Sequence, residues 1–423
     1  MADEGDNNNI ERYEEGTTVV MVWDSSGRKR IEIVVPIITH IYRGEEGEII
    51  PREATHIIVG EDVTFVRERA FRNHPNIVEV ICHEKVEKIE FWAFDCCPNL
   101  RRVIMPGVKI VGESAFEGCR ALTDMKFDKL EIIEIEAFCS CYSLMSINLP
   151  TARIVEGAAF QYCTALTDVK FGSKLEIIGV DAFTECKSLR SINLSSARIV
   201  KGYAFAHCTA LTTVKFGSKL ERFERYAFEE TALAFYNCRS LERITIPLKD
   251  GLITEDNIFQ GCESLTQVDL VEGELHETIA ALHLEEWRND MNEAINSINR
   301  ILPDASAGYY DEEYGEEDDE DYGEKARAIR RWIRSILFKI IDYQEEHQRI
   351  LDEFATTLQL ALPNDIVVNN VLFFLELPSH TFEVEGDEDE EELDASYSEG
   401  EETEREEDSS GNEEEWDNDA DDA

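Results

Sequence analysis

The chain lacks long apolar runs, a leader-like start and the short motifs of common enzymes. No apolar stretch approaches the roughly 20 residues that a helix needs to cross a bilayer, which predicts no membrane binding through a spanning segment. Residues 1–6 have neither the basic nor the apolar part of a secretory signal, so we expect a cytoplasmic protein, with the nucleus as an alternative. The P-loop, GxGxxG and HExxH patterns are absent, and the histidines are scattered. We therefore predict no enzymatic activity, no cofactor and no metal.

Basic residues are also scarce. The chain has 41 Lys and Arg against 90 Asp and Glu, which gives a formal net charge of −49. The excess acid is concentrated in residues 311–321 and 383–423, where Arg405 is the single base, whereas residues 56–272 are close to balance. Because phosphate backbones require concentrated Lys and Arg, we expect no direct nucleic-acid binding.

The chain does contain a repeat. An apolar residue and Phe are followed by Cys three residues after the Phe and by Leu six residues after it, in eight copies from Phe94 to Phe259. A ninth copy at Phe71 has His74 in place of Cys, and most copies lie 22 or 23 residues apart. The apolar positions nine and eleven residues after Phe alternate as in a short strand with one buried face. This spacing is typical of a solenoid, which favours binding over catalysis.

The repeat resembles the BspA-type (Treponema-type) leucine-rich repeat, whose units read approximately LxxIxxxAFxxCxxLxxVxLP. Residues 175–194 read LEIIGVDAFTECKSLRSINL, and the resemblance extends over roughly residues 56–271. The helix-like continuation after the repeats is similar to that of diatom members. The resemblance implies a curved solenoid that binds other macromolecules, commonly proteins, without catalysis.

The expected fold class is an α/β repeat solenoid with short parallel strands. We expect a β-rich N-terminal cap with a disordered start at 1–55 and the solenoid at 56–272. A helical region follows at 273–378, with an acidic loop at 303–324, and a disordered acidic tail at 379–423. An insertion at 229–234 interrupts the repeats and predicts either a loop or a kink.

Two types of unit alternate, which indicates duplication of a two-unit block and predicts regular rows of outward side chains about 4.8 Å apart. One row contains Arg102, Asp124, Ser146, Asp168, Ser191, Thr213 and Arg243. A parallel row contains Lys126, Asn148, Lys170, Asn193 and Lys215. We predict that this face binds a protein partner; the alternative is that duplication alone explains the rows and that the face is only solvated.

All eleven cysteines lie between Cys82 and Cys262, and eight of them occupy one repeat position. Cysteine is among the residues most often fully buried, so this column is interpreted as packing. Disulfides would require the parallel side chains to reorient, and zinc requires clustered ligands, which leaves both as weaker alternatives. Cys96 and Cys139 lie off the column and are expected to be exposed.

The C-terminal region leaves several interpretations open. Its apolar residues recur at steps of three and four, which predicts two amphipathic helices that either cap the solenoid or form a coiled-coil homodimer. The acidic tail either attracts basic proteins such as histones or only keeps the chain in solution. Residues 362–375 are faintly similar to the start of an F-box, the module of ubiquitin-ligase substrate receptors.

Overall fold

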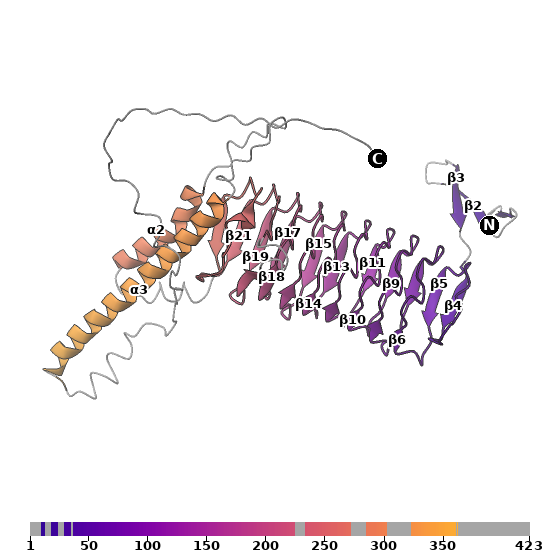
Figure 1. Ribbon diagram of the computed structural model, residues 1–423, viewed down its shortest axis with the longest axis horizontal. Coiled ribbons are helices and arrows are strands. Elements are labelled where there is room, and N and C mark those ends of the chain that lie inside the picture. The colour runs from indigo at the N-terminus through magenta and orange to yellow at the C-terminus, as the bar shows by residue number, and fades with distance from the viewer. Residues whose placement is uncertain are drawn as a thin grey trace, which may run out of the picture. The chain divides into compact units, whose positions relative to one another are not determined.

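The computed structural model describes residues 10–12, 18–23, 29–34, 37–224, 233–271, 285–302, 323–360 and 362 (Figure 1). Within these ranges no helix combines the length and the apolar character that crossing a bilayer demands. The acidic tail, the 303–322 part of the acidic loop and the F-box-like 363–375 stretch lie outside the described residues.

The first three strands form an antiparallel sheet of their own. They are β1 (Ile10–Arg12), β2 (Thr18–Trp23) and β3 (Lys29–Val34), in the order β1-β2-β3. The next strand, β4 (Thr39–Tyr42), is parallel to β5 (His56–Val59) and begins the repeat sheet. The repeat sheet therefore includes residues from the segment that was expected to form the N-terminal cap.

Eleven longer strands, one for each turn of the solenoid, form what we call the long-strand face (Figure 1). They are parallel and group as β4–β5–β7–β9–β11, β13–β15 and β17–β19–β21–β22. Beyond β4 and β5, their bounds are β7 (Glu79–Ile81), β9 (Arg102–Ile104), β11 (Asp124–Lys126), β13 (Ser146–Leu149), β15 (Asp168–Phe171), β17 (Ser191–Leu194), β19 (Thr213–Phe216), β21 (Arg243–Ile246) and β22 (Gln267–Leu270).

Eight shorter strands form a second parallel sheet on the other side of the core. They are β6 (Phe65–Val66), β8 (Lys88–Ile89), β10 (Ile110–Val111), β12 (Ile132–Ile133), β14 (Ile154–Val155), β16 (Ile177–Ile178), β18 (Ile199–Lys201) and β20 (Arg222–Glu224). The second residue of each of these strands is buried. The predicted α/β repeat solenoid of parallel strands is thus confirmed.

The turn that carries each Phe forms a third ladder between the two sheets. Around Phe94, the residues two positions before and after it, Trp92 and Cys96, have φ of 54° and 55°. The N–H of Phe94 donates to the carbonyl of Ala115 in the next unit at 2.8 Å, and the N–H groups of Trp92 and Cys96 make equivalent bonds. Left-handed backbone is costly for residues other than glycine, and these inter-unit hydrogen bonds hold the turn in that conformation.

The Phe side chains stack along the core. Their ring centroids are 4.8–5.7 Å apart from Phe71 to Phe259, and consecutive ring planes differ by 14° or less. Tyr42 packs on the first ring of the stack at 5.0 Å. Residues 225–232 lie outside the described residues, yet Phe205 stacks on Phe235 at 5.6 Å. The column of stacked rings therefore continues from Phe205 to Phe235.

The C-terminal end of the core is covered by helices. A short 3-10 helix, η1 (Asp256–Phe259), contacts α3 (Glu324–Gln359), and α2 (Glu285–Ile301) contacts β22 and α3. The indole N–H of Trp332 donates to the carbonyl of Ala294 at 3.0 Å, and Arg334 pairs with the buried Asp250 at 3.1 Å. Since solenoid ends need such a cover, the arrangement supports the capping interpretation. The homodimer through these helices stays a prediction.

Candidate functional site

The first predicted row lies on the long-strand face, in register within each group of strands. Arg102 is opposite Asp124, Ser146 is opposite Asp168, and Ser191, Thr213 and Arg243 follow one another. All seven residues of this row are exposed or half-buried, because their strand neighbours Val103, Ile147, Ile192, Val214 and Ile244 point into the core. The structure therefore brings the predicted residues together as a row.

The second predicted row runs beside the first. Asn148 is opposite Lys170, and Asn193 is opposite Lys215. These four residues and Lys126, the fifth member of the row, are all exposed. At its N-terminal side, Lys126 is opposite Ile104 of β9. The row therefore extends beyond the predicted residues.

That extension consists of isoleucines, which the sequence analysis missed. Ile41, Ile58, Ile81 and Ile104 are in register on four neighbouring strands. Ile41, Ile58 and Ile81 are 52%, 44% and 36% exposed, and Ile104 is half-buried. We call these four residues the isoleucine row. They could have been found by continuing the Lys126 position toward the N-terminus, one repeat at a time.

Ion pairs connect the charged residues of the long-strand face. Arg102 lies 3.2 Å from Glu79 and 2.9 Å from Asp124, and Lys170 lies 3.3 Å from Asp168. These groups are largely in solvent, so the pairs contribute little to stability. The long-strand face therefore carries paired charges, amides and hydroxyls, and it ends on its N-terminal side in the isoleucine row. Such a surface suits contact with another macromolecule better than chemistry at one point.

The cysteine column is buried, as predicted, and all of its thiols have the same kind of hydrogen-bond partner. Every Sγ donates to the carbonyl oxygen of the Phe in the preceding unit, at 3.0–3.2 Å. Burial raises the pKa of the column thiols from Cys119 to Cys262, to about 12 for Cys262. His74, which occupies the column in the first copy, places its Nε2 3.0 Å from the carbonyl oxygen of Pro51. The column is thus structural.

Three thiols lie off the column. Cys82 is buried, and the other two, Cys96 and Cys139, differ from each other. Cys96 is exposed, and a hydrogen bond with Asp95 raises its pKa to about 11. Cys139 was expected to be exposed, but it is buried, and its Sγ lies 3.7 Å from the hydroxyl of Ser140. The expectation was wrong because Cys139 directly follows Phe138, a repeat position that is also buried at Asp95, Thr184 and Ala206, whereas Cys96 lies one residue further on. All eleven cysteines are free, so the disulfide alternative receives no support.

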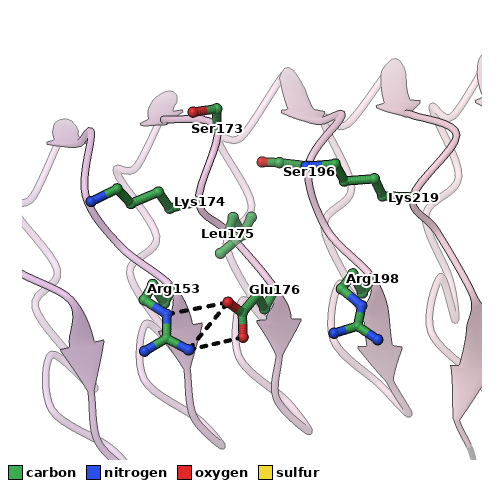
Figure 2. A pocket seen from close by; sticks show the side chains of 8 residues that line it. All are labelled: Arg153, Ser173, Lys174, Leu175, Glu176, Ser196, Arg198 and Lys219. Carbon is green, nitrogen blue, oxygen red and sulfur yellow. Dashed lines mark hydrogen bonds and ion pairs between the residues drawn. The ribbon is translucent and has the colours of Figure 1, made fainter.

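A shallow hollow of about 400 Å³ lies where the units enter the short strands (Figure 2). Its lining comes from four successive units and consists of Arg153, Ser173, Lys174, Leu175, Glu176, Ser196, Arg198 and Lys219. In Figure 2 the guanidinium of Arg153 faces the carboxylate of Glu176, with N–O distances of 3.2 Å. The hollow has a strongly basic lining on a chain that is acidic as a whole.

Within the described ranges, no group of three or more His, Cys, Asp or Glu side chains is placed to hold a metal ion. The residues invoked for capture of basic proteins, 383–423, lie outside those ranges, as do most of the F-box-like residues. The long-strand face and the hollow are therefore the two surfaces on which function can be argued from geometry.

The family model for the BspA type leucine rich repeat region matches this chain in six copies, over residues 52–152, 131–234 and 231–281. A leucine-rich repeat protein from Bacteroides ovatus is 22% identical, with 64% of this chain and 77% of that chain covered and a TM-score of 0.38. A leucine rich cell surface protein from Faecalibacterium prausnitzii is 17% identical, with 64% and 97% covered and a TM-score of 0.28. The T. pallidum leucine rich repeat protein is 22% identical, with 49% and 84% covered and a TM-score of 0.30. No curated protein matches the chain.

Proposed function

Because the chain belongs to the BspA-type leucine-rich repeat family, we propose that it is a non-catalytic scaffold that binds a protein partner on its long-strand face. The fold is typical of protein–protein interaction. In this proposal the isoleucine row supplies apolar contact, and the two polar rows supply hydrogen bonds and fix the register of the partner.

The observation that carries the proposal is the exposure of Ile41, Ile58 and Ile81 in one row. The aligned positions on later strands are Lys126, Lys170 and Lys215 or Asn148 and Asn193, so solvent-exposed isoleucine is confined to one end of the face. Contiguous exposed apolar surface with a polar rim marks interaction sites on soluble proteins. The partner is accordingly a protein that offers its own apolar side chains beside polar groups.

A cytoplasmic location belongs to the same proposal. All eleven thiols are free, although eight of them follow one another along the column. Free thiols in this number suit a reducing compartment. The partner would then be an intracellular protein.

The test replaces Ile58 and Ile81 together with Thr. Threonine keeps the β-branch that strands favour but removes apolar surface. The matched control is Ile154→Thr with Ile177→Thr, which makes the same change at outward, half-buried positions of the short-strand sheet. The proposal expects the unchanged chain and the control variant to capture the same protein from native lysate. The Ile58/Ile81 variant should fail to capture that protein, although its thermal midpoint is unchanged. Equal capture by all three proteins would exclude this face.

The alternative is capture of basic proteins by the acidic tail, which rests on the concentration of acid in residues 383–423. Deletion of these residues would abolish binding to histone-like proteins if the alternative holds. Substituting Lys126, Lys170 and Lys215 with Glu would leave that binding intact but remove a partner of the long-strand face. The two experiments together separate the tail from the sheet.

A further inference from the structure

A second surface runs along the line where the units enter their short strands, away from the long-strand face. Lys129, Lys174 and Lys219 occupy the same position in alternate units, and all three are exposed. Each lies two residues before a glutamate, and the intervening units carry Arg153 and Arg198 at the glutamate position. We call Lys129, Lys174 and Lys219 the lysine edge; the hollow in Figure 2 lies between its last two members.

Two members of the lysine edge are held by the same backbone turn. Gly172-Ser173-Lys174 recurs as Gly217-Ser218-Lys219. A Cβ on Gly172 would lie 1.9 Å from the carbonyl oxygen of Pro150, and one on Gly217 would lie 2.1 Å from that of Ser195. Only glycine permits these close approaches, so the two turns have little freedom to differ. Lys174 and Lys219 therefore leave the backbone in the same way, two units apart.

The glutamates beside Lys174 and Lys219 are already paired. Arg153 binds Glu176 with N–O distances of 3.2 Å, and Arg198 binds Glu221 at 2.9 Å through its Nε. Arg198 also lowers the pKa of Glu221, which keeps that carboxylate ionised and paired. In the part of the chain that the structure describes, neither Lys174 nor Lys219 has a carboxylate within ion-pair distance. The ammonium groups of the edge are thus available to an external anion.

We propose that the lysine edge binds an extended acidic polypeptide segment that carries a carboxylate at every third residue. Neighbouring parallel strands are about 4.8 Å apart, so two units advance the solenoid by about 10 Å. A polyproline-II chain rises about 3.1 Å per residue with three residues per turn, which places every third side chain on one side at about 9 Å intervals. The carboxylates of such a segment match the spacing of the lysines, and Ser173 in the hollow can donate to the same oxygens, whereas the hydroxyl of Ser196 already donates to the carbonyl of Gly172 at 2.9 Å.

The interleaved charges favour a polypeptide over a nucleic acid. A nucleic-acid strand presents phosphates continuously and gains affinity from uninterrupted basic surface. On this surface Glu131, Glu176 and Glu221 lie in the same units as the lysines, two residues along the chain, and interrupt the basic surface, so they would repel phosphates that run past the ammonium groups. A peptide with neutral residues between its carboxylates avoids that repulsion.

The test measures binding of labelled peptides to the full-length protein by fluorescence anisotropy at low salt. The periodic probe is (Glu-Pro-Pro)5, and the control probe has the same composition with its glutamates grouped at one end. The edge variant is Lys174→Ser with Lys219→Ser. Its matched control is Lys170→Ser with Lys215→Ser, which removes equal charge at the same separation from the long-strand face.

The proposal expects the periodic probe to bind more tightly than the grouped probe, and the edge variant to weaken it about fivefold, since exposed charge pairs contribute modestly. The control variant should change the Kd by less than about twofold. If the edge variant and the control variant lose affinity for the periodic probe equally, the effect comes from net charge alone, which would overturn the proposal. So would absence of binding, or an oligothymidine that binds the edge as tightly as the periodic probe. None of these readouts depends on Ile58 or Ile81. A negative result for the lysine edge therefore does not contradict the proposal that a protein partner binds the long-strand face.

Discussion

The thiol of Cys119 donates a hydrogen bond to the carbonyl oxygen of Phe94 in the preceding unit, at 3.1 Å. The same oxygen accepts the N–H of Cys97 in its own unit at 3.3 Å. The carbonyl of Phe94 therefore accepts two hydrogen bonds. Cysteine suits this position because it is small and apolar and still donates a weak hydrogen bond.

We expect Cys141→Ala to lower the free energy of unfolding by about 1–2 kcal/mol, because it removes the bond from Sγ to the Phe116 oxygen and leaves a small void. Urea denaturation followed by circular dichroism measures the change. The exposed Cys96→Ala is the control and should shift stability by less than about 0.5 kcal/mol. Equal effects of the two substitutions would show that the column bond does not stabilise the core.

Alkylation of the native protein should reach Cys96 first but slowly. The Asp95 carboxylate raises the pKa of Cys96 to about 11, so few molecules carry the reactive thiolate at pH 8. Asp95→Asn removes that charge and should accelerate labelling of Cys96 by iodoacetamide several-fold, as read by mass spectrometry. Cys163, which is fully buried, is the internal control and should stay unlabelled in both proteins. An unchanged rate at Cys96 would mean that access, and not thiolate content, limits the reaction.

The repeating core could be predicted from the sequence because each position has one environment throughout the solenoid. The Phe, Cys and Leu columns are buried as expected, and the predicted outward rows are in register. Phe235, at which the repeat restarts after the insertion, continues the stack of Phe rings, as its place in the repeat predicts.

Other features are hidden from the composition of a single strand or repeat, for physical reasons. Ile58 lies between the buried Ile57 and Val59, so three apolar residues in a row resemble a strand buried on both faces and hide the outward one. The left-handed turns carry Trp92, Cys96 and Tyr162 in place of glycine, and their cost is offset only by inter-unit hydrogen bonds that a single repeat does not contain. The lysine edge depends on Gly172 approaching a carbonyl of another unit, which spacing alone does not indicate.

Glu117 gives the protein a pH dependence of defined sign. Desolvation raises its pKa, and the nearby Glu136 and Asp95 raise it further. The folded state therefore binds a proton at Glu117 more readily than the unfolded state does. The ionised carboxylate destabilises the fold at neutral pH, and this destabilisation is lost as pH falls through the raised pKa. Glu117→Gln should raise the thermal midpoint at pH 7, and the advantage should disappear below the unfolded pKa of about 4.3. A constant advantage at all pH values would point to packing instead of charge.

Gly172→Ala should destabilise the protein by about 1–3 kcal/mol, because the added Cβ would lie 1.9 Å from the Pro150 oxygen and the backbone would have to move. Gly157→Ala is the matched control, since its Cβ would lie 3.4 Å from the nearest oxygen. It should be neutral or slightly stabilising through the unfolded state. Chemical denaturation compares the two. If both alanines are tolerated, the turn that carries Lys174 is not fixed by this approach.

Arg334 attaches the helical cap to the last repeat. Its guanidinium lies 3.1 Å from the carboxylate of Asp250, whose side chain is 2% exposed. Breaking a buried pair from one side leaves the other charge poorly compensated, so Arg334→Ala should cost about 3 kcal/mol, measured by urea denaturation. Arg349→Ala removes the same side chain from an exposed pair with Glu346 on the same helix and should cost less than about 1 kcal/mol. Amide hydrogen exchange adds a local readout: in the Arg334 variant, protection should fall in β22 and in the N-terminal half of α3 before it falls in β9. Uniform loss of protection along the solenoid would show that the cap and the repeats unfold as one unit and would contradict a local role for this ion pair.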